Sequence, residues 1–258
     1  MLYLVMLKQA KEHSFISIVI PCYKAGDFII KTLQQVSAEL KKLARDYEII
    51  CVIDGIVDDS FSKAKNFAKN NPHIKVFAYK KNRGKGYAVR YGLKRAKGEI
   101  IGFIDAGGEI DPASLVELVK TFDNKKADIV VGSKRHPNSD VVYPFLRRVF
   151  SLVYLYFIKV LFGIRLSDTQ AGIKLFRKEV IKRLLPLLTV DGFAFDIEII
   201  TLAKVYGFDK VYEAPIKVRM LQSEKASTIE NFGTLIKASL EMIYDSLKIY
   251  FKVRGGKV

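Results

Sequence analysis

The amino-acid sequence predicts an α/β fold of Rossmann-like type, in which helices cover both faces of a mostly parallel sheet. Three observations support this prediction. Strand-like and helix-like segments alternate along the first half of the chain, the pattern of parallel strands joined by helical crossovers. The strand-like runs are apolar throughout, as expected for strands buried on both faces. The chain has 258 residues, 50% hydrophobic, and no Pro/Gly/Ser-rich linker, which indicates one domain with a substantial core.

The elements of the first half follow from short apolar runs and from the helical spacing of apolar residues. Strands are expected at Phe15–Pro21, Tyr47–Ile53, Ile74–Ala78, Glu99–Ile104 and Asp128–Val131. Helices are expected at Asp27–Arg45, around Ser60–Asn70, through Tyr87–Ala96 and from Pro112 onward. The apolar residues of each helix should pack on the sheet.

The pattern changes after Gly132. Pro144 begins a helix that is predicted to run to about Phe162, with Gly163 as the residue that ends it. Residues 173–176, 196–206 and 210–218 are predicted as strand, helix and strand. The final segment, Ile229–Phe251, is strongly amphipathic, because its apolar residues recur at helical spacing.

The chain divides into three parts in this interpretation. Residues 1–14 form an N-terminal arm, 15–227 an α/β domain that includes a helical region at 141–165, and 228–258 a C-terminal amphipathic helix. The apolar Met1–Leu7 is too short to span a bilayer, and the run Val149–Ile164 falls short of the roughly 20 apolar residues that a spanning helix needs. The sequence therefore predicts a soluble or peripheral membrane protein.

The net charge restricts the class of partner. A formal charge of +16 predicts a polyanion, which is nucleic acid, an anionic membrane or a phosphorylated substrate. No nucleic-acid-binding motif is recognisable, so nucleic acid rests on charge alone and is not expected. Cys22 and Cys51 lie inside apolar runs without metal-ligand spacing, which indicates free core thiols in a reducing compartment.

Three predicted strands end in loops that carry polar or aromatic residues. These loops are Pro21-Cys22-Tyr23, Asp54-Gly55 and Asp105-Ala106-Gly107. Ligands of open α/β sheets bind beyond the carboxyl ends of the strands, so the three loops together favour a nucleotide site. Tyr23 is suited to stack on a base, and Asp54 to accept hydrogen bonds from a base or ribose. Each loop alone is better explained as an ordinary strand-end turn.

Carboxylates follow the fourth strand, at Asp105, Glu109 and Asp111. Oxygen ligands on a glycine-rich loop suit a hard divalent cation that shares its remaining positions with substrate phosphates. The alternative is a polar turn in which Asp111-Pro112 starts the next helix.

The segment Asn82-Arg83-Gly84-Lys85-Gly86 is a basic loop that opens a helix. Backbone amides and Lys85 at a helix N-terminus suit a pyrophosphate, although the glycine spacing is not that of a Walker loop. The alternative is a solvated loop.

Four segments of the first half, in order, resemble family 2 glycosyltransferases of GT-A fold: Phe15–Tyr23, Tyr47–Ser60, Asn82–Gly98 and Ile101–Pro112. Three segments of the second half resemble the polyprenyl-phosphate branch of that family: Gly132–Arg135, Ser167–Phe176 and Gly192–Glu198. Dolichyl-phosphate glucosyltransferases are closer to this pattern than dolichyl-phosphate mannose synthases. The resemblance covers nearly the whole chain from Phe15 and makes 15–227 the catalytic domain.

The resemblance implies roles for individual residues. Pro21, Tyr23 and Asp54 would hold the nucleoside, and Lys85 and Ala106 would also line the donor site. Asp105 and Glu109 would bind Mg²⁺ or Mn²⁺. The residues implied to contact donor or acceptor phosphates are Arg135, Lys174, Arg219 and Lys225, and those implied to cradle the lipid phosphate are Arg147 and Ser151. Taken singly, such basic residues are more often surface charges.

Two positions depart from the family pattern. Ile53 stands where the first of two paired aspartates is usual, and Gly107 stands where the second aspartate of an Asp-x-Asp motif is usual. The loss at Gly107 predicts weak metal binding, an altered site or lost activity.

The expected function is transfer of a hexose from a nucleotide sugar to a polyprenyl phosphate, with inversion. UDP-glucose is the favoured donor and GDP-mannose the alternative. Asp105, Arg135 and Asp196 are the candidate catalytic residues; Asp196 would act as a base only for a hydroxyl acceptor, because a phosphate monoester with a second pKa of about 6 is already dianionic at neutral pH. The competing hypothesis is a catalytically silent sugar-nucleotide-binding or membrane-scaffold protein.

A lipid acceptor requires contact with a bilayer, at the cytoplasmic face according to this resemblance. Between Val141 and Arg183 nine basic residues are opposed only by Asp168 and Glu179. Together with the aromatic residues of the 141–165 helix, this charge predicts a helix at an anionic membrane surface. The C-terminal helix is a second such element. The alternative is packing on the core or in a homo-oligomer interface.

Overall fold

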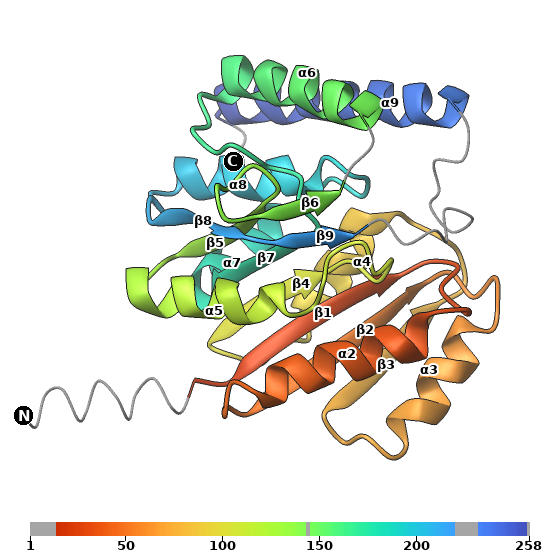
Figure 1. Ribbon diagram of the computed structural model, residues 1–258. Helices are drawn as coiled ribbons and strands as arrows, with labels where there is room; N and C mark the ends of the chain where they lie inside the picture. Colours follow the sequence, from red (N-terminus) through yellow and green to blue (C-terminus); the bar gives the residue numbers. More distant parts are fainter. Residues whose placement is uncertain (1–13, 143–144, 220–231, 257–258) are drawn as a thin grey trace, which may run out of the picture.

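The protein is described by a computed structural model for residues 14–142, 145–219 and 232–256, without the side chains of 145–147 and 232–236. Its centre is a seven-stranded sheet in the order β3-β2-β1-β4-β7-β5-β8 (Figure 1). The strands are β1 Ile16–Cys22, β2 Tyr47–Asp54, β3 Ile74–Tyr79, β4 Ile100–Ile104, β5 Ile129–Ser133, β7 Ile173–Arg177 and β8 Val211–Pro215. A second sheet pairs β6 Asp140–Val142 with β9 Lys217–Arg219.

Helices cover both faces of the sheet, as the sequence predicts. Their bounds are α2 Ile29–Lys41, α3 Ser60–Ala68, α4 Lys85–Leu93, α5 Ser114–Lys125, α6 Phe145–Phe162, α7 Lys178–Leu184, α8 Phe195–Val205 and α9 Phe232–Arg254, with a 3-10 turn at Leu185–Leu187. One core lies between the sheet and α2, α3 and α5. The other lies between the sheet and α4, α6, α7, α8 and α9.

The strands divide their side chains between these two cores. In β1, Ile18 and Ile20 belong to the first core, whereas Val19 belongs to the second. Successive side chains of a strand point to opposite faces, so a strand buried on both sides must be apolar at nearly every position. Burial of both faces of the sheet therefore explains the apolar runs from which the strands were predicted.

One strand runs against the direction of the others, a direction that the sequence pattern does not predict. β7 lies between β4 and β5 and is antiparallel to both. Its first residue, Ile173, pairs with Ile104 at the end of β4. The chain therefore enters β7 at the carboxyl edge of the sheet and can only run back, because no crossover returns it to the other edge first.

The second half contains elements that the apolar pattern does not predict. The expected strand 210–218 is two strands, β8 and β9, that belong to different sheets. The short β6 and α7 were not expected. Both are too brief for a clear periodicity, and β6 acquires its partner only from β9, which lies far along the chain.

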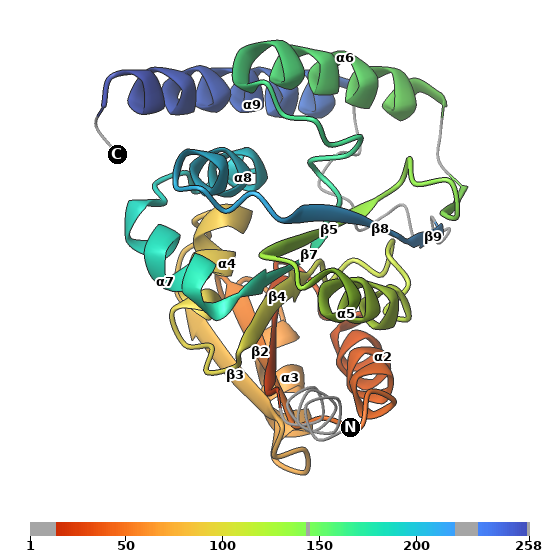
Figure 2. The same cartoon turned by 90° about the vertical axis from the view of Figure 1, so that its left-hand side faces the viewer.

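Helices α6 and α9 form an outer layer above α8 (Figures 1 and 2). They are joined by a hydrogen bond of 2.8 Å between the Tyr154 and Ser246 hydroxyls. Ile158 of α6 and Ile249 of α9 point into the second core and are buried. Within the ranges given above, no helix combines the length and the apolar character needed to cross a bilayer.

Candidate active site

Three loops that the sequence places at one edge of the sheet do meet there. β2, β1 and β4 are adjacent and parallel, so the ends of these strands, and the residues that follow them, lie side by side. Pro21 pairs with Val52 near the end of β1, and Tyr23 comes directly after the strand. The carbonyl oxygen of Ala106, beyond β4, accepts a 3.0 Å hydrogen bond from Thr32.

Asp54 ends β2 and is buried. Its carboxylate accepts hydrogen bonds from the Asn82 side chain at 3.0 Å and from the backbone amides of Arg83 and Gly84 at 2.7 and 3.0 Å. Gly84 has a φ of +99°, which the loop needs just before α4 begins. In this structure Asp54 therefore shapes the 82–84 loop, a role that the sequence does not predict; its contact with a base or ribose stays a prediction.

The 82–86 loop brings Lys85 to the carboxylate beyond β4. The Lys85 ammonium lies 2.9 Å from Oδ2 of Asp105 and 3.6 Å from Oδ2 of Asp196. Asp196 in turn accepts a hydrogen bond from Lys174, whose ammonium also donates to the carbonyl oxygen of Ala171 at 2.8 Å. Four predicted site residues, from α4, β7, α8 and the loop after β4, thus form one chain of alternating charges.

The two lysines of this chain have opposite pKa shifts. Burial disfavours the charged form of Lys85, but Asp105 and Asp196 outweigh burial and raise the pKa of this lysine. Burial lowers the pKa of Lys174, and repulsion from Lys85 adds to that effect while Asp196 opposes it. Lys174 is fully buried and pairs with Asp196; its contact with a phosphate stays a prediction.

Asp105 is fitted closely against β7. Its backbone amide donates a 2.8 Å hydrogen bond to the carbonyl oxygen of Gly172. A Cβ atom at position 172 would lie 1.8 Å from Oδ2 of Asp105, so only glycine leaves room for the carboxylate. The other oxygen, Oδ1, is buried and has no hydrogen-bond partner among the described residues.

These features bear on a divalent cation. A partly exposed carboxylate suits a cation ligand, and the Asp105 side chain is 40% exposed. A Cβ at Gly107 would meet nothing within 4 Å, so the loop has open space beside Asp105. In the described part of the chain, however, no three His, Cys, Asp or Glu side chains are grouped to hold a metal. The residues therefore fit a cation that takes most of its ligands from a bound diphosphate and water.

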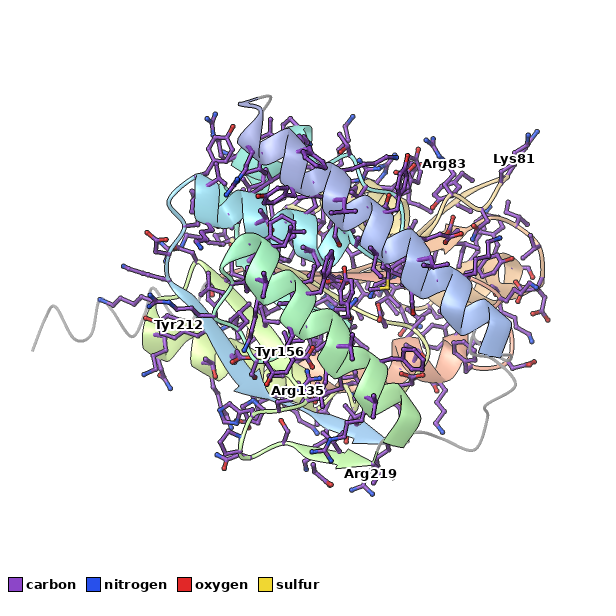
Figure 3. The ribbon with its side chains drawn as sticks, turned by 90° about the horizontal axis from the view of Figure 1, so that it is seen from above. Lys81, Arg83, Arg135, Tyr156, Tyr212 and Arg219 are labelled. Carbon is purple, nitrogen blue, oxygen red and sulfur yellow. The ribbon has the colours of Figure 1, made fainter. Side chains whose placement is uncertain are left out.

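The loop after Asp105 lies along β9. The Arg219 amide donates to the Glu109 carbonyl oxygen at 2.9 Å, and Ile110 forms an antiparallel bridge with Val218. Arg219 is exposed and lies 3.4 Å from Asp140. Figure 3 shows its label near the N-terminal end of α6. Two predicted site residues, Glu109 and Arg219, are thus neighbours through their backbones.

Arg135 and Ser151 are brought together. The Arg135 guanidinium donates to the Ser151 hydroxyl and to the Ser167 carbonyl oxygen, both at 3.0 Å. Arg135 follows β5, whereas Ser151 is on α6, so the contact joins the sheet to the outer helix layer. Lys225 and the side chain of Arg147 lie outside the described residues.

Several residues that fix the site were not found from the sequence. Asp168 accepts from the Lys134 ammonium at 2.9 Å and from the Gln170 amide at 3.0 Å, which holds the loop before β7. Glu198 accepts from the amides of Thr189 and Val190. Glu198 is an acidic residue in a mostly apolar stretch, whereas Asp168 stands among polar residues and carries no such signal. The partners of both are set by the fold.

Comparison with solved structures identifies the fold class. Glucosyl-3-phosphoglycerate synthase from Mycobacterium tuberculosis, solved with Mn²⁺, UDP and phosphoglyceric acid, superposes with a TM-score of 0.71 at 20% identity, covering 95% of this chain and 81% of that one. The same protein was also solved with Mg²⁺ and UDP. The mostly parallel sheet, flanked by helices, is thus the GT-A fold of glycosyltransferases, and the predicted fold class is confirmed.

Sequence comparison then identifies the family. Residues 17–185 match the family model Glycosyl transferase family 2. Dolichyl-phosphate beta-glucosyltransferase of Dictyostelium discoideum is 30% identical over 268 residues, covering 98% of this chain and 79% of that protein. The enzyme of the same name from Saccharomyces cerevisiae is 32% identical, covering 76% of this chain and 64% of that protein. The chain belongs to glycosyl transferase family 2, which confirms the resemblance seen in the sequence.

Proposed function

We propose that this protein transfers glucose from UDP-glucose to a polyprenyl phosphate such as dolichyl phosphate. The observation that carries the proposal is the Arg135–Ser151 pair, which places a guanidinium and a hydroxyl where the catalytic sheet meets the α6 and α9 layer. That location suits a phosphate whose lipid tail extends along the outer helices. The names of the relatives supply the sugar and the lipid.

Asp105 and Glu109 are the side chains that we assign to Mg²⁺ or Mn²⁺ on the donor side. The Asp105 side chain is 40% exposed, and Glu109 is exposed on the same loop. A divalent cation on the donor diphosphate stabilises the charge of the departing nucleotide. Arg219 lies beside Glu109 and supplies further positive charge for the phosphates, while Pro21, Tyr23 and Ala106 line the nucleoside side.

The acceptor needs positioning more than deprotonation. A phosphate monoester is largely dianionic at neutral pH, because its second pKa is about 6. Arg135 orients this anion and reduces its repulsion from the donor phosphates. Direct attack by the acceptor oxygen on the sugar inverts the anomeric centre. Asp196 is paired with Lys174 and Lys85, so we assign it a positioning role rather than that of a base.

We further propose that α6 and α9 rest on an anionic membrane surface. Their outward residues recur at helical spacing and leave large apolar side chains exposed: Val149, Val153, Tyr156 and Val160 on α6, and Leu240, Ile243, Tyr244, Leu247 and Phe251 on α9. The two helices lie side by side when viewed from above (Figure 3). Exposed cations flank the apolar residues at Arg148, Lys237, Lys248 and Arg254. Apolar residues beside basic ones are typical of interfacial helices.

Vesicle sedimentation tests the membrane proposal. Val153→Glu and Phe251→Glu should each weaken binding to vesicles that contain anionic lipid, because each puts a charge on the apolar face. Val205→Glu is the matched control, since Val205 of α8 is 51% exposed but lies outside α6 and α9. Equal binding by all three variants would reject the proposal.

A transfer assay tests the function. Purified protein, polyprenyl phosphate and labelled UDP-glucose or GDP-mannose, with Mn²⁺ or Mg²⁺, should give a labelled glycolipid with UDP-glucose. Arg135→Gln should raise the KM for the lipid phosphate much more than the KM for the donor. Nucleotide binding by calorimetry without any product, before and after Gly107→Asp, would instead favour the catalytically silent alternative.

A further inference from the structure

Lys85 holds the accessible oxygen of the one aspartate that follows β4 directly. The Asp105 side chain is 40% exposed, although its Oδ1 is buried. The exposure therefore belongs to the Oδ2 side of the carboxylate. Oδ2 is the atom that lies 2.9 Å from the Lys85 ammonium, so an incoming cation meets Lys85 at the oxygen that it can reach.

The surroundings keep Lys85 in this position. Its side chain is only 14% exposed, and its ammonium lies between Asp105 and Asp196, 5.6 Å from the centre of the Phe103 ring. Lys85 is the first residue of α4, directly after the Asp54-anchored loop. The ammonium of a surface lysine is mobile and hydrated. The Lys85 ammonium is instead held by two carboxylates, next to a loop that Asp54 fixes.

Because residue 107 is glycine, the site lacks a second carboxylate at the position where one could bind a second cation. A carboxylate at that position would give the site a second accessible anion, and its place is open. With glycine there, a divalent cation and the Lys85 ammonium share the Asp105 carboxylate, and Glu109, two residues further along the loop, is the other carboxylate that we assign to the cation. Two cations close to one carboxylate repel each other strongly in a partly buried site.

We infer that Lys85 is a resident cation of the donor site, which competes with the divalent cation for Asp105 until a nucleoside diphosphate brings enough negative charge for both. The inference rests on the proposed donor site, but it does not require sugar transfer. Its consequence is coupled binding: the free protein binds Mn²⁺ weakly, and UDP and Mn²⁺ each strengthen the binding of the other by the same factor.

Mn²⁺ binding, measured by electron paramagnetic resonance with and without UDP, tests this inference. Lys85→Met should tighten Mn²⁺ binding to the UDP-free protein about tenfold or more, because it removes a competing charge. It should also reduce the coupling between Mn²⁺ and UDP. Lys85→Arg keeps the charge and should keep Mn²⁺ binding weak.

Lys81→Met is the control for net charge. Lys81 lies in the same connection between β3 and α4 but is exposed, and Figure 3 shows it at the periphery of the molecule. Its loss should leave Mn²⁺ affinity within about twofold of wild type, since exposed charges are screened. An equal gain from Lys81→Met and Lys85→Met would overturn the inference, as would unchanged or weaker Mn²⁺ binding in Lys85→Met.

Wild-type protein gives a second test that does not depend on the folding of a variant. The affinity of Mn²⁺ for the UDP-bound protein should be at least about tenfold higher than the affinity of Mn²⁺ for free UDP. Mn²⁺ binding that is already tight without UDP would reject the inference. Absence of glycolipid product combined with the expected Mn²⁺ results would reject the proposed function and leave the role of Lys85 standing.

Discussion

At the scale of single residues, the site depends on the room that Gly172 leaves for Asp105. A Cβ at position 172 would lie 1.8 Å from Oδ2 of Asp105 and 2.3 Å from its carboxyl carbon. The neighbouring atoms belong to a side chain that is also held by Lys85. A methyl group there must therefore displace the carboxylate or the backbone just before β7.

Gly172→Ala should lower the transfer rate by about 100-fold or more, because an ångström of misplacement in a catalytic group costs that order of rate. The assay is kcat for glycolipid formation, with thermal unfolding to show that the protein remains folded. Gly107→Ala is the matched control, since a Cβ there meets nothing within 4 Å. Loss of activity in Gly107→Ala but not in Gly172→Ala would contradict this account of the loop.

The buried pair of Lys174 and Asp196 gives a prediction about stability. Both side chains are almost completely buried. Lys174→Met should reduce the free energy of unfolding by about 3 kcal/mol or more, because removing one partner leaves a buried charge that is only partly compensated. Lys42→Met removes the exposed pair with Glu39 and should cost less than about 1 kcal/mol.

Urea unfolding at neutral pH measures both variants. If Lys174→Met and Lys42→Met lose a similarly small free energy of unfolding, then Lys85, at 3.6 Å from Asp196, compensates the charge of Asp196 by itself.

Residue identity predicted part of this site and not the rest. Asp105 follows an apolar strand and precedes glycines, so the sequence predicts a cation-binding carboxylate there, with an ordinary polar turn as the alternative; that role stays a prediction. Its pairing with Lys85, and the pairing of Asp196 with Lys174 and Lys85, link positions that are far apart in the chain. Such ion pairs are set by strand order and helix placement, which residue spacing does not encode.

At the scale of elements, α6 has two faces with different tasks. Ile158 is fully buried, whereas Val160 is 87% exposed. Ile158→Ala should cost about 2–5 kcal/mol in the free energy of unfolding, because it leaves a cavity in the core. Val160→Ala should change stability by less than about 0.5 kcal/mol while weakening binding to anionic vesicles.

Chemical denaturation and vesicle sedimentation on the same preparations separate the two effects. Equal destabilisation by the two substitutions would mean that the exposed face of α6 is covered in solution by another part of an assembly.

Elements were predictable where they are long and regular. The helix predicted from Pro144 to Phe162 ends at Phe162 as expected, because its apolar residues have a clear period. The direction of β7 was not predictable, since a short apolar strand reads the same either way. What sets its direction is the return of the chain to the carboxyl edge, visible in the pairing of Ile173 with Ile104.

At the scale of the whole molecule, carboxylates tie loops together within each half of the site, one by the buried Asp168 and one by the exposed Asp58. Asp168 ties the residues after β5 to the loop before β7 through Lys134 and Gln170. Asp58 ties the loop after β1 to α3 through the Gly26 amide and Ser60. The sequence predicts one domain, but the sites of these links follow from tertiary structure. Acid should therefore loosen several loops of the site together.

The pKa of Asp168 gives the direction of this effect. Burial alone would raise it, but Lys134 and the backbone amides outweigh burial and hold the pKa below its ordinary value of 3.8. A carboxyl with a lower pKa in the folded state binds fewer protons there than when unfolded, so its stabilising contribution is complete above that ordinary value. The contribution is lost as the pH falls through the pKa of the folded state.

Asp168→Asn should therefore be less stable than wild type at pH 7, and the difference should shrink as the pH falls below about 4. Urea unfolding of both proteins between pH 7 and pH 3 measures the difference directly. Asp59→Asn is the control, because Asp59 pairs with Lys63 at the surface and is 57% exposed, so its contribution should be small throughout. A difference for Asp168→Asn that stays constant or grows toward low pH would show that Asp168 stabilises the loop through its shape and not through its charge.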